Sequence, residues 1–376
     1  MSKTPNLRFK EFSGDWEIKK LGDLANIGTG KKDTQDKIED GKYPFFVRSQ
    51  IVERINSYSF DGEAILTAGD GVGVGKVFHY INGKFDYHQR VYKLSDFKEG
   101  TSGRYIYEYF KKNFIREVTK YTAKTSVDSV RMEMITKMDI PCPSIEEQEK
   151  IASFFSLIDD KISLQGEKVE VLKDYKTGMM QKIFSRELRF KDDDGRDYPE
   201  WEEKKIKDIF TVTRGVVIAK NEISDLMDNI NQYPVYSSQT SNNGILGYDS
   251  KYDFEGDYLT WTTDGANAGK VFRRNGKFRC TNVCGVLVEK EETLGFANKM
   301  ISEILNKETP KHVSYVGNPK LMNGVMGDIK IKVPILDEQI KIAKVLDSID
   351  LKIEKEQEKL DSLKQYKKGL LQQMFV

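Results

Sequence analysis

Apolar residues in positions 143–184 recur at alternating steps of four and three, the spacing of one face of a long helix. These residues are Ile151, Phe155, Ile158, Ile162, Val169, Leu172, Met179 and Ile183. Ser144-x-x-Glu147 has the form of a capping box, in which two side chains bond each other's backbone N–H groups. The pattern predicts a helix that begins near Pro143 and ends near Phe184.

The same pattern returns at positions 334–375, where 19 of 42 residues are identical at a constant offset of 191. Its apolar positions are Ile342, Leu346, Ile349, Ile353, Leu360, Leu363, Leu370 and Met374. Both copies are interrupted at matching places, by Gln165/Glu356 and by Lys176/Lys367. An apolar face with a 3.5-residue repeat favours a partner helix, so we expect the two copies to form a coiled coil. The alternative is two ordinary amphipathic helices, each packed on its own domain, but about 42 residues greatly exceeds the usual helix length.

The expected helix length also predicts the direction of the pair. About 42 residues of helix span ~60 Å, whereas a domain of about 150 residues has a radius of gyration of only ~15 Å. The second helix should therefore begin near the end of the first and run back along it. We expect an antiparallel pair with pseudo-two-fold symmetry and one globular module near each end.

The modules are duplicated too. Each half opens with Leu-Arg-Phe-Lys, at positions 7–10 and 188–191, and Trp-Glu follows at Trp16 and Trp201. Asn82-Gly83 and Asn275-Gly276 lie between β-branched and aromatic stretches, which predicts hairpin turns. We predict an α+β fold of two related mixed modules and two long helices. The domains expected are a first module at 1–142, a first long helix at 143–187, a second module at 188–333 and a second long helix at 334–376.

The two modules share short islands of sequence but differ between them. Asp70-Gly71 matches Asp264-Gly265, whereas residues 31–41 differ freely from residues 217–232. A shared scaffold with dissimilar loops indicates two related tasks on two different targets.

Composition narrows the class of protein. The chain has 376 residues, 38% of them hydrophobic, which is enough for two packed domains. Charged residues make up 32%, but the net charge is only +1, so basic surfaces must be local. No apolar run approaches the ~20 residues of a membrane span, and the first ten residues lack the apolar core of a secretion signal. With only three cysteines, we expect a reducing, cytoplasmic location.

No catalytic or metal-binding motif is complete. Residues 71–76 superficially match a phosphate-binding loop, but Asp70 and Val77 stand where that loop needs glycine and a hydroxyl residue. Cys280 and Cys284 lack a second pair, so buried thiols are favoured over zinc. Glu17-x-Lys19 and Glu202-x-Lys204 match the tail of a nuclease motif but suit a solvated strand edge better. We therefore expect a non-enzyme without a metal or cofactor of its own.

Basic residues gather once in each half. Residues 270–279 hold five basic residues and no acid, and residues 111–131 also carry a basic excess. Such groups can neutralise DNA phosphates, although each cluster alone could be a solvated face. The candidate DNA-binding residues, chosen by charge and loop position, are Lys31, Lys32, Arg90, Lys120, Lys124, Arg131, Arg214, Lys270, Arg273, Arg274, Lys277 and Lys320.

A family resemblance rests on two features that occur in both halves. The first is the opening of each module through Trp16 or Trp201, and the second is the start of each long helix, at Ile140-Pro141-Cys142-Pro143 and Val333-Pro334. Each helix start continues into a Glu-Gln-x-Lys-Ile-Ala motif, at Glu147 and Glu338. In these features the chain resembles the specificity subunit of type I restriction-modification systems. Lys332 departs from the pattern by replacing the first proline of the second start.

The resemblance implies a non-catalytic reader of a split, asymmetric DNA site, with the helices as a ruler. Two modification subunits would methylate adenine N6 from S-adenosylmethionine, and two restriction subunits would cut with ATP and magnesium. The residues expected to pair the helices or bind these partners are Gln148, Ile151, Phe155, Ile158, Ile162, Leu172, Gln339, Ile342, Leu346, Ile349, Ile353 and Leu363. The alternative is a coiled-coil scaffold without sequence-specific DNA recognition.

Overall fold

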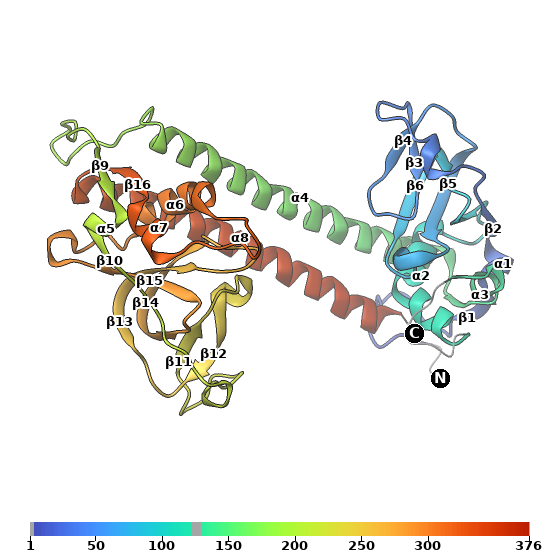
Figure 1. Cartoon of the computed structure of the whole chain (residues 1–376). Coiled ribbons are helices and arrows are strands. Elements are labelled where there is room, and N and C mark those ends of the chain that lie inside the picture. The colour runs from blue at the N-terminus through green and yellow to red at the C-terminus, as the bar shows by residue number, and fades with distance from the viewer. Residues whose placement is uncertain (1–3, 122–128, 376) are drawn as a thin grey trace. The chain divides into compact units, whose positions relative to one another are not determined.

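The computed structural model describes residues 4–121 and 129–375 (Figure 1). The chain divides into two compact units. Unit 1 consists of Met1–Glu167 with Gln357–Val376, and unit 2 of Lys168–Glu356. Each unit contains one module and parts of both long helices. The predicted domain boundaries follow the helix starts instead, so they describe a different division and stay a prediction.

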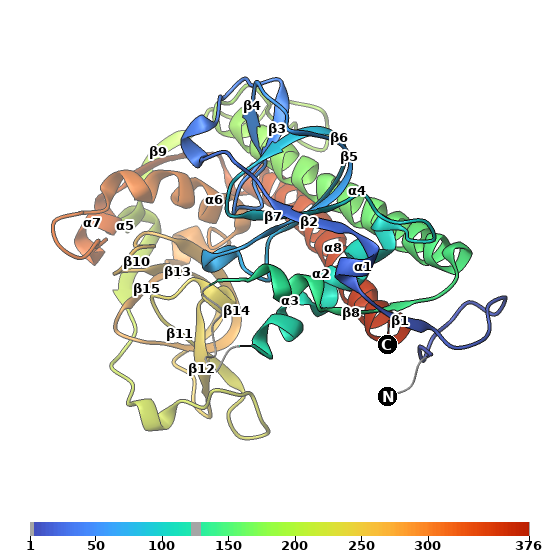
Figure 2. The same cartoon turned by 90° about the vertical axis from the view of Figure 1, so that its right-hand side faces the viewer.

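The module of unit 1 is built on a six-stranded sheet with the order β2-β7-β5-β6-β3-β4 (Figure 2). All its neighbours are antiparallel except β3 and β6, which run parallel. A two-stranded ribbon of β1 and β8 joins the start of the module to its end. The elements are β1 (Glu17–Lys20), α1 (Leu21–Leu24), β2 (Asn26–Thr29), β3 (Tyr43–Phe46), β4 (Glu53–Ile55), β5 (Phe60–Ala68), β6 (Phe78–Tyr87), β7 (Val91–Ser95), α2 (Gly103–Thr119), α3 (Met132–Thr136) and β8 (Asp139–Cys142).

Unit 2 repeats this topology. Its sheet has the order β10-β15-β13-β14-β11-β12, and the ribbon is β9 with β16. The parallel pair also recurs, as β11 with β14. The elements are β9 (Glu202–Lys205), α5 (Ile206–Ile209), β10 (Phe210–Arg214), β11 (Tyr233–Tyr236), β12 (Ile245–Asp249), β13 (Phe254–Thr262), β14 (Val271–Cys280), β15 (Cys284–Glu289), α6 (Lys299–Glu308), α7 (Asn323–Asp328) and β16 (Lys330–Val333). The predicted duplication of whole modules is confirmed.

The two long helices are confirmed as α4 (Ile145–Phe184) and α8 (Leu336–Met374). In unit 1 the ring of Phe155 stacks on that of Phe375 with centroids 5.8 Å apart, and Asp159 lies 2.6 Å from Lys367. Residue numbers rise along α4 as they fall along α8, so the segments run antiparallel. In unit 2 the same direction follows from the ion pairs Lys168–Glu356, at 2.9 Å, and Lys176–Asp350, at 2.8 Å.

Each unit has one main core that the long helices help to build. In unit 1 the buried residues Ile151 and Phe155 of α4 join Leu370 and Met374 of α8. In unit 2 Ile183 joins Ile342 and Leu346. The predicted pairing residues Ile158 and Ile349 are also buried, whereas Ile162, Leu172, Ile353 and Leu363 are half-buried. Both alternatives for the helices therefore hold in part, because the same faces contact the other helix and the module.

Gln148 and Gln339 do not contribute to a helix–helix seam. Gln148 is buried and donates to the carbonyl of Pro143, and its Oε1 accepts from the N–H of Ser102. Gln339 makes the corresponding bonds with Pro334 and with the amide of Asn298. These glutamines fix each helix start to the first turn of α2 or α6.

The Asn-Gly hairpin turns predicted from the sequence are wrong. Asn82 and Gly83 lie inside β6, where Gly83 faces Gly62 of β5, and Gly276 faces Gly256 in the other unit. Gly62 and Gly83 have φ angles of +147° and +144°, which side chains of L-residues rarely allow. The turn that closes this hairpin is instead the glycine-rich segment 69–77, which contains a 3₁₀ turn at Gly71–Gly73. No described helix is long and apolar enough to cross a membrane.

Candidate nucleic-acid interface

In unit 1 four chain segments meet, three of them the loops that follow strands β3, β5 and β6. The N–H of His88 donates to the carbonyl of Phe46 at 2.9 Å, and that of Gly69 donates to Arg90 at 2.8 Å. The N–H of Val130 donates to Gly69 at 2.7 Å. These bonds join the loops after β3, β5 and β6 to residues 129–131. We call this surface the loop edge.

Unit 2 has the same three bonds at equivalent positions. Thr281 donates to Tyr236 at 2.9 Å, Thr263 to Val283 at 3.2 Å, and Leu321 to Thr263 at 2.9 Å. A bridge between Asp70 and Ser129 likewise matches one between Asp264 and Lys320. The two loop edges therefore share one backbone frame. Their equivalent residues are Arg48 and Ser238, Asp70 and Asp264, Arg90 and Val283, and Ser129 and Lys320.

In unit 1 the loop edge carries two arginines that share one carboxylate. Arg48 Nη1 donates to Asp70 Oδ1 at 2.8 Å, and Arg90 Nε lies 3.7 Å from Asp70 Oδ2. The side chains of Arg48 and Arg90 are 44% and 66% exposed, whereas that of Asp70 is 23% exposed. Asp70 thus anchors two guanidinium groups that stay open to solvent.

Two histidines, half-buried His79 and buried His88, hold the loops that carry these arginines. The ring Nε2 of His79 lies 2.9 Å from the carbonyl of Ser49, and Nδ1 of His88 accepts from the N–H of Arg90 at 2.9 Å. Burial lowers the pKa of His79, and burial followed by the charge of Arg48 lowers the pKa of His88. Both imidazoles are therefore neutral near pH 7, which suits the acceptor role of His88.

The loop edge of unit 2 carries different chemistry. Thr263 Oγ1 donates to Asp264 Oδ2 at 2.7 Å, and Asn267 Nδ2 donates to Thr240 Oγ1 at 3.0 Å. Lys320 Nζ lies 4.0 Å from Asp264. Hydroxyl groups, an amide and a lysine thus replace the arginine pair on an equivalent frame.

Several predicted DNA-binding residues lie at these two loop edges. In unit 1, Lys32 forms an isolated β-bridge with His88, and Lys31 is the residue before Lys32. Arg131 directly follows Val130, whose N–H donates to Gly69. In unit 2, Arg214 ends β10 beside Gly285, and Lys270 closes the β13–β14 connection. Together with Arg90 and Lys320, the set comprises Lys31, Lys32, Arg90, Arg131, Arg214, Lys270 and Lys320. Their contact with DNA stays a prediction.

The other candidates lie elsewhere. Lys120 pairs with Glu117 at 2.6 Å, and Lys124 falls outside the described residues. Arg273 lies on β14, 3.4 Å from both Asp257 and Asp347. Lys277, also on β14, lies over the ring of Tyr252.

Arg274 is placed in the interior of unit 2, with only 3% of its surface exposed. Its Nε donates to Thr260 Oγ1 at 3.0 Å and its Nη1 to the carbonyl of Asn243 at 2.8 Å. The guanidinium also lies 3.6 Å from the centre of the Tyr236 ring, and burial lowers its pKa. This arginine holds the sheet to the 241–244 turn and is not available to a partner.

A basic groove in unit 1 joins residues that are distant in sequence. A cavity of about 640 Å³ is lined by Lys111 and Arg116 from α2 and by Lys364 and Lys368 from α8. Lys112, Lys367 and Asp159 also line it, and Lys367 pairs with Asp159 at 2.6 Å. The sequence predicted the basic residues of α2, but it did not predict that they lie beside basic residues of α8.

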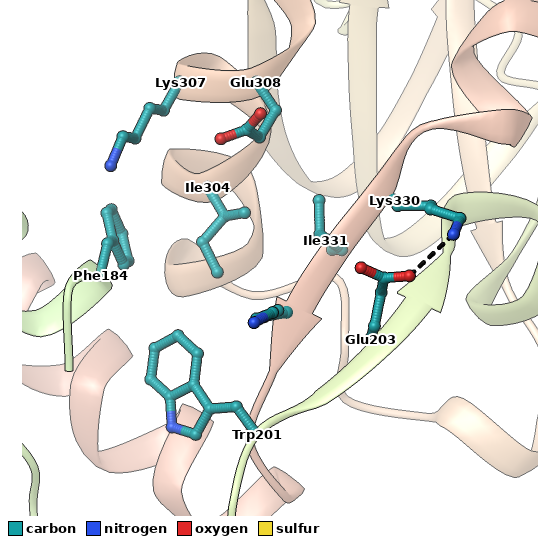
Figure 3. Close-up of a pocket in the computed structure, with 9 residues that line it drawn as sticks. Phe184, Trp201, Glu203, Ile304, Lys307, Glu308, Lys330 and Ile331 are labelled. Atoms are coloured by element: carbon teal, nitrogen blue, oxygen red, sulfur yellow. Dashed lines mark hydrogen bonds and ion pairs between the residues drawn. The ribbon is translucent and has the colours of Figure 1, made fainter.

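A smaller cavity in unit 2, of about 270 Å³, lies between the β9–β16 ribbon and α6 (Figure 3). Trp201, Phe184 and Ile304 form its apolar wall, and Lys330 pairs with Glu203 at its rim at 2.8 Å. None of its lining residues belongs to the loop edge. Cys280 and Cys284 are buried as predicted, and Cys142 is buried too. No group of three possible metal ligands occurs in the described part of the chain.

Comparison with known proteins agrees with the duplicated architecture. A Mycoplasma pneumoniae protein named as the N-terminus of a type I specificity subunit is 44% identical over 145 residues, 38% of this chain and 75% of its own. The MjaVIII type I restriction enzyme specificity subunit of Methanocaldococcus jannaschii is 26% identical across 96% of this chain and 94% of its own.

The fold has also been observed in solved structures. The crystal structure of a type I restriction-modification S subunit from M. genitalium matches with a TM-score of 0.67, covering 99% of both chains at 17% identity. The sequence matches the type I restriction modification DNA specificity domain twice, over residues 13–174 and 198–365. The two matches together span most of the chain, one for each module. The chain therefore belongs to the family of the type I restriction-modification DNA specificity domain.

Proposed function

We propose that the chain is the DNA-recognition subunit of a type I restriction-modification complex and reads a split, asymmetric site. Each module would recognise one half of the site, and α4 and α8 would set the gap between the halves. The observation that carries this proposal is the pair of loop edges, which share a backbone frame but expose different side chains. Equivalent frames with dissimilar donors suit two related readings of two different sequences.

The chemistry would belong to partner subunits. Two modification subunits would bind S-adenosylmethionine and methylate adenine N6 in each half-site, after flipping the base from the duplex. Two restriction subunits, where the system has them, would use ATP and magnesium to cut unmethylated DNA. The role of this chain is to place those partners on the correct sequence, in the cytoplasm, where the DNA is accessible.

Mapping methylated adenines tests the proposal. Cells expressing the full chain with the modification subunit of its system should carry methyl groups at one split motif. Replacing residues 11–139 with the matching segment of another family member should change one half of that motif and keep the other. Absence of any split motif would reject DNA reading and favour a scaffold. A change in both halves would contradict the assignment of one half-site to each module.

A further inference from the structure

We propose that Arg48 and Arg90, held jointly by Asp70, form the guanine-reading element of the first module. The inference rests on the proposed function and specifies which bases one module selects. It predicts a G·C pair in the half-site read by unit 1 and names the side chains that select it.

The shared carboxylate leaves each guanidinium free to bind a base. A guanidinium has five N–H donors in a planar fork. Arg48 donates to Asp70 through its Nη1, at 2.8 Å, and Arg90 approaches Asp70 with its Nε, 3.7 Å away. The remaining donors can pair with O6 and N7 of guanine, the two neighbouring acceptors that this base presents in the major groove.

The backbone around the pair is fixed before any ligand arrives. Gln50 Nε2 donates to the carbonyl of Lys76 at 2.7 Å, and His79 bonds the carbonyl of Ser49, so the loop that carries Arg48 is tied to β6 and to the β5–β6 connection. Arg90 sits in a tight turn between β6 and β7, and its carbonyl accepts from Gly69. Preorganised arginines lose less conformational entropy when they bind.

The charge balance favours base edges over phosphates. The carboxylate beside two arginines lowers the net charge of the group and so weakens its attraction for a phosphate, whereas O6 and N7 of guanine carry only partial negative charges, which Asp70 opposes less. A site built for phosphate alone would not need Asp70, because the exposed arginines would bind better without it. The carboxylate is therefore a positioning group for a directional contact.

Unit 2 provides an internal comparison. Ser238 and Val283 occupy the positions of Arg48 and Arg90, although Asp264 is retained. There the carboxylate accepts from Thr263 instead of an arginine. The second module therefore lacks the fork, and the guanine preference should be confined to one half-site.

The test is selection from a pool of duplexes randomised in both half-sites, with the full chain assembled with its modification subunits. Arg48→Lys and Arg90→Lys keep the positive charge but remove the fork. Each should reduce the preference for guanine at one position of the first half-site by about 10-fold, the discrimination expected of one bidentate contact. Arg196→Lys is the matched control, since Arg196 pairs with Asp192 on an exposed turn that is part of neither loop edge.

The second half-site reports on folding in the same experiment. A variant that selects the second half normally is folded and assembled, so a loss confined to the first half supports the inference. Unchanged selection by both lysine variants would overturn it. The inference would also be overturned if Arg48→Ala bound all DNA sequences more weakly to the same extent, with the slope of log K against log salt reduced by about one phosphate contact. If the unaltered chain selects no motif, the proposed function itself fails.

Discussion

Arg8 and Glu147 lie 139 positions apart and form a two-pronged ion pair. Nε and Nη2 of Arg8 donate to the two oxygens of Glu147 at 2.8 and 2.7 Å. Arg189 and Glu338 repeat the arrangement in unit 2, where Nη2 donates at 2.9 Å. Both carboxylates are almost fully buried. The Leu-Arg-Phe-Lys opening and the Glu-Gln helix start therefore recur because they pair with each other.

Replacing Glu147 with Gln should lower the free energy of unfolding by about 3 kcal/mol, because Arg8 keeps its charge but loses its buried partner. Glu149→Gln is the matched control, since Glu149 is exposed on the same turn of α4 and should change stability by less than about 0.5 kcal/mol. Denaturant unfolding of both variants measures the difference. Equal stability of the two would show that the pair does not hold the helix start.

The lysines that interrupt the helix pattern also have defined partners. Lys367 lies 2.6 Å from Asp159 of α4 and 3.0 Å from Glu108 of α2. Lys176 lies 2.8 Å from both Asp350 and Glu303, and Lys299 also contacts Glu303, at 3.0 Å. Each cluster joins a module helix to both long helices. A buried polar contact of this kind specifies register in helix pairs.

The two clusters should respond oppositely to pH. Burial raises the pKa of Glu108 above its ordinary value of 4.5, since Lys367 and Lys111 offset it only in part and the charge of Asp159 adds to it. Burial also acts on Glu303, but Lys176 and Lys299 outweigh it and lower the pKa. The ionised form is thus disfavoured by folding at Glu108 and favoured at Glu303. Glu303 contributes stability above pH 4.5, and this contribution is lost as the pH falls through the pKa of Glu303 in the folded protein. Glu108 behaves oppositely, because its contribution is present below pH 4.5 and is lost as the pH rises through its raised folded pKa.

Glu303→Gln should therefore destabilise unit 2 at pH 7, and Glu108→Gln should leave unit 1 equally stable or more stable. The Glu108→Gln difference should shrink as the pH approaches 4, because Glu108 becomes neutral like glutamine. The Glu303→Gln difference should begin to shrink below pH 4.5 and vanish only as the pH falls through the lowered folded pKa of Glu303. Urea unfolding at pH 7 and pH 4 measures this, with each variant as the control for the other. A larger loss for Glu108→Gln at pH 7 would contradict the assigned directions.

Neighbouring arginines on β14 should differ in their effect on stability. Arg274 is buried and bonded to Thr260 and Asn243, whereas Arg273 is 39% exposed. We expect Arg274→Gln to cost about 2 to 3 kcal/mol because buried acceptors lose their donor. Arg273→Gln should cost less than about 1 kcal/mol. Thermal unfolding distinguishes them, and equal melting temperatures would show that the Arg274 contacts are dispensable.

The long helices could be predicted because their signal is local. A 3.5-residue repeat over about 40 positions, present twice, specifies both an element and its partner. The duplication also predicted the equivalent modules. The capping box at Ser144 holds only in part: Ser144 Oγ accepts from the N–H of Glu147, but the carboxylate of Glu147 bonds Arg8 instead.

The candidate site was less predictable because it depends on contacts between distant segments. The arginine pair joins residues from three loops, and Arg48 lies outside the basic runs that drew attention to residues 111–131 and 270–279. Within the second run, counting charges missed that strand alternation turns Arg273 outward and Arg274 inward. Period-two alternation was the signal that could have separated them.

The spacing role of α4 and α8 predicts a specific change in the DNA gap. Deleting 163–169 and 354–360 removes equivalent seven-residue segments from both helices and keeps the ion pairs Asp159–Lys367 and Lys176–Asp350. Seven residues of helix measure about 10 Å, and stacked base pairs are ~3.4 Å apart, so the gap should shorten by about three base pairs. Methylated-adenine mapping reads the gap directly. Deleting only 163–169 is the control, because it shifts α4 against α8 and should abolish methylation. Methylation at the original gap after the double deletion would mean that helix length does not set the spacing.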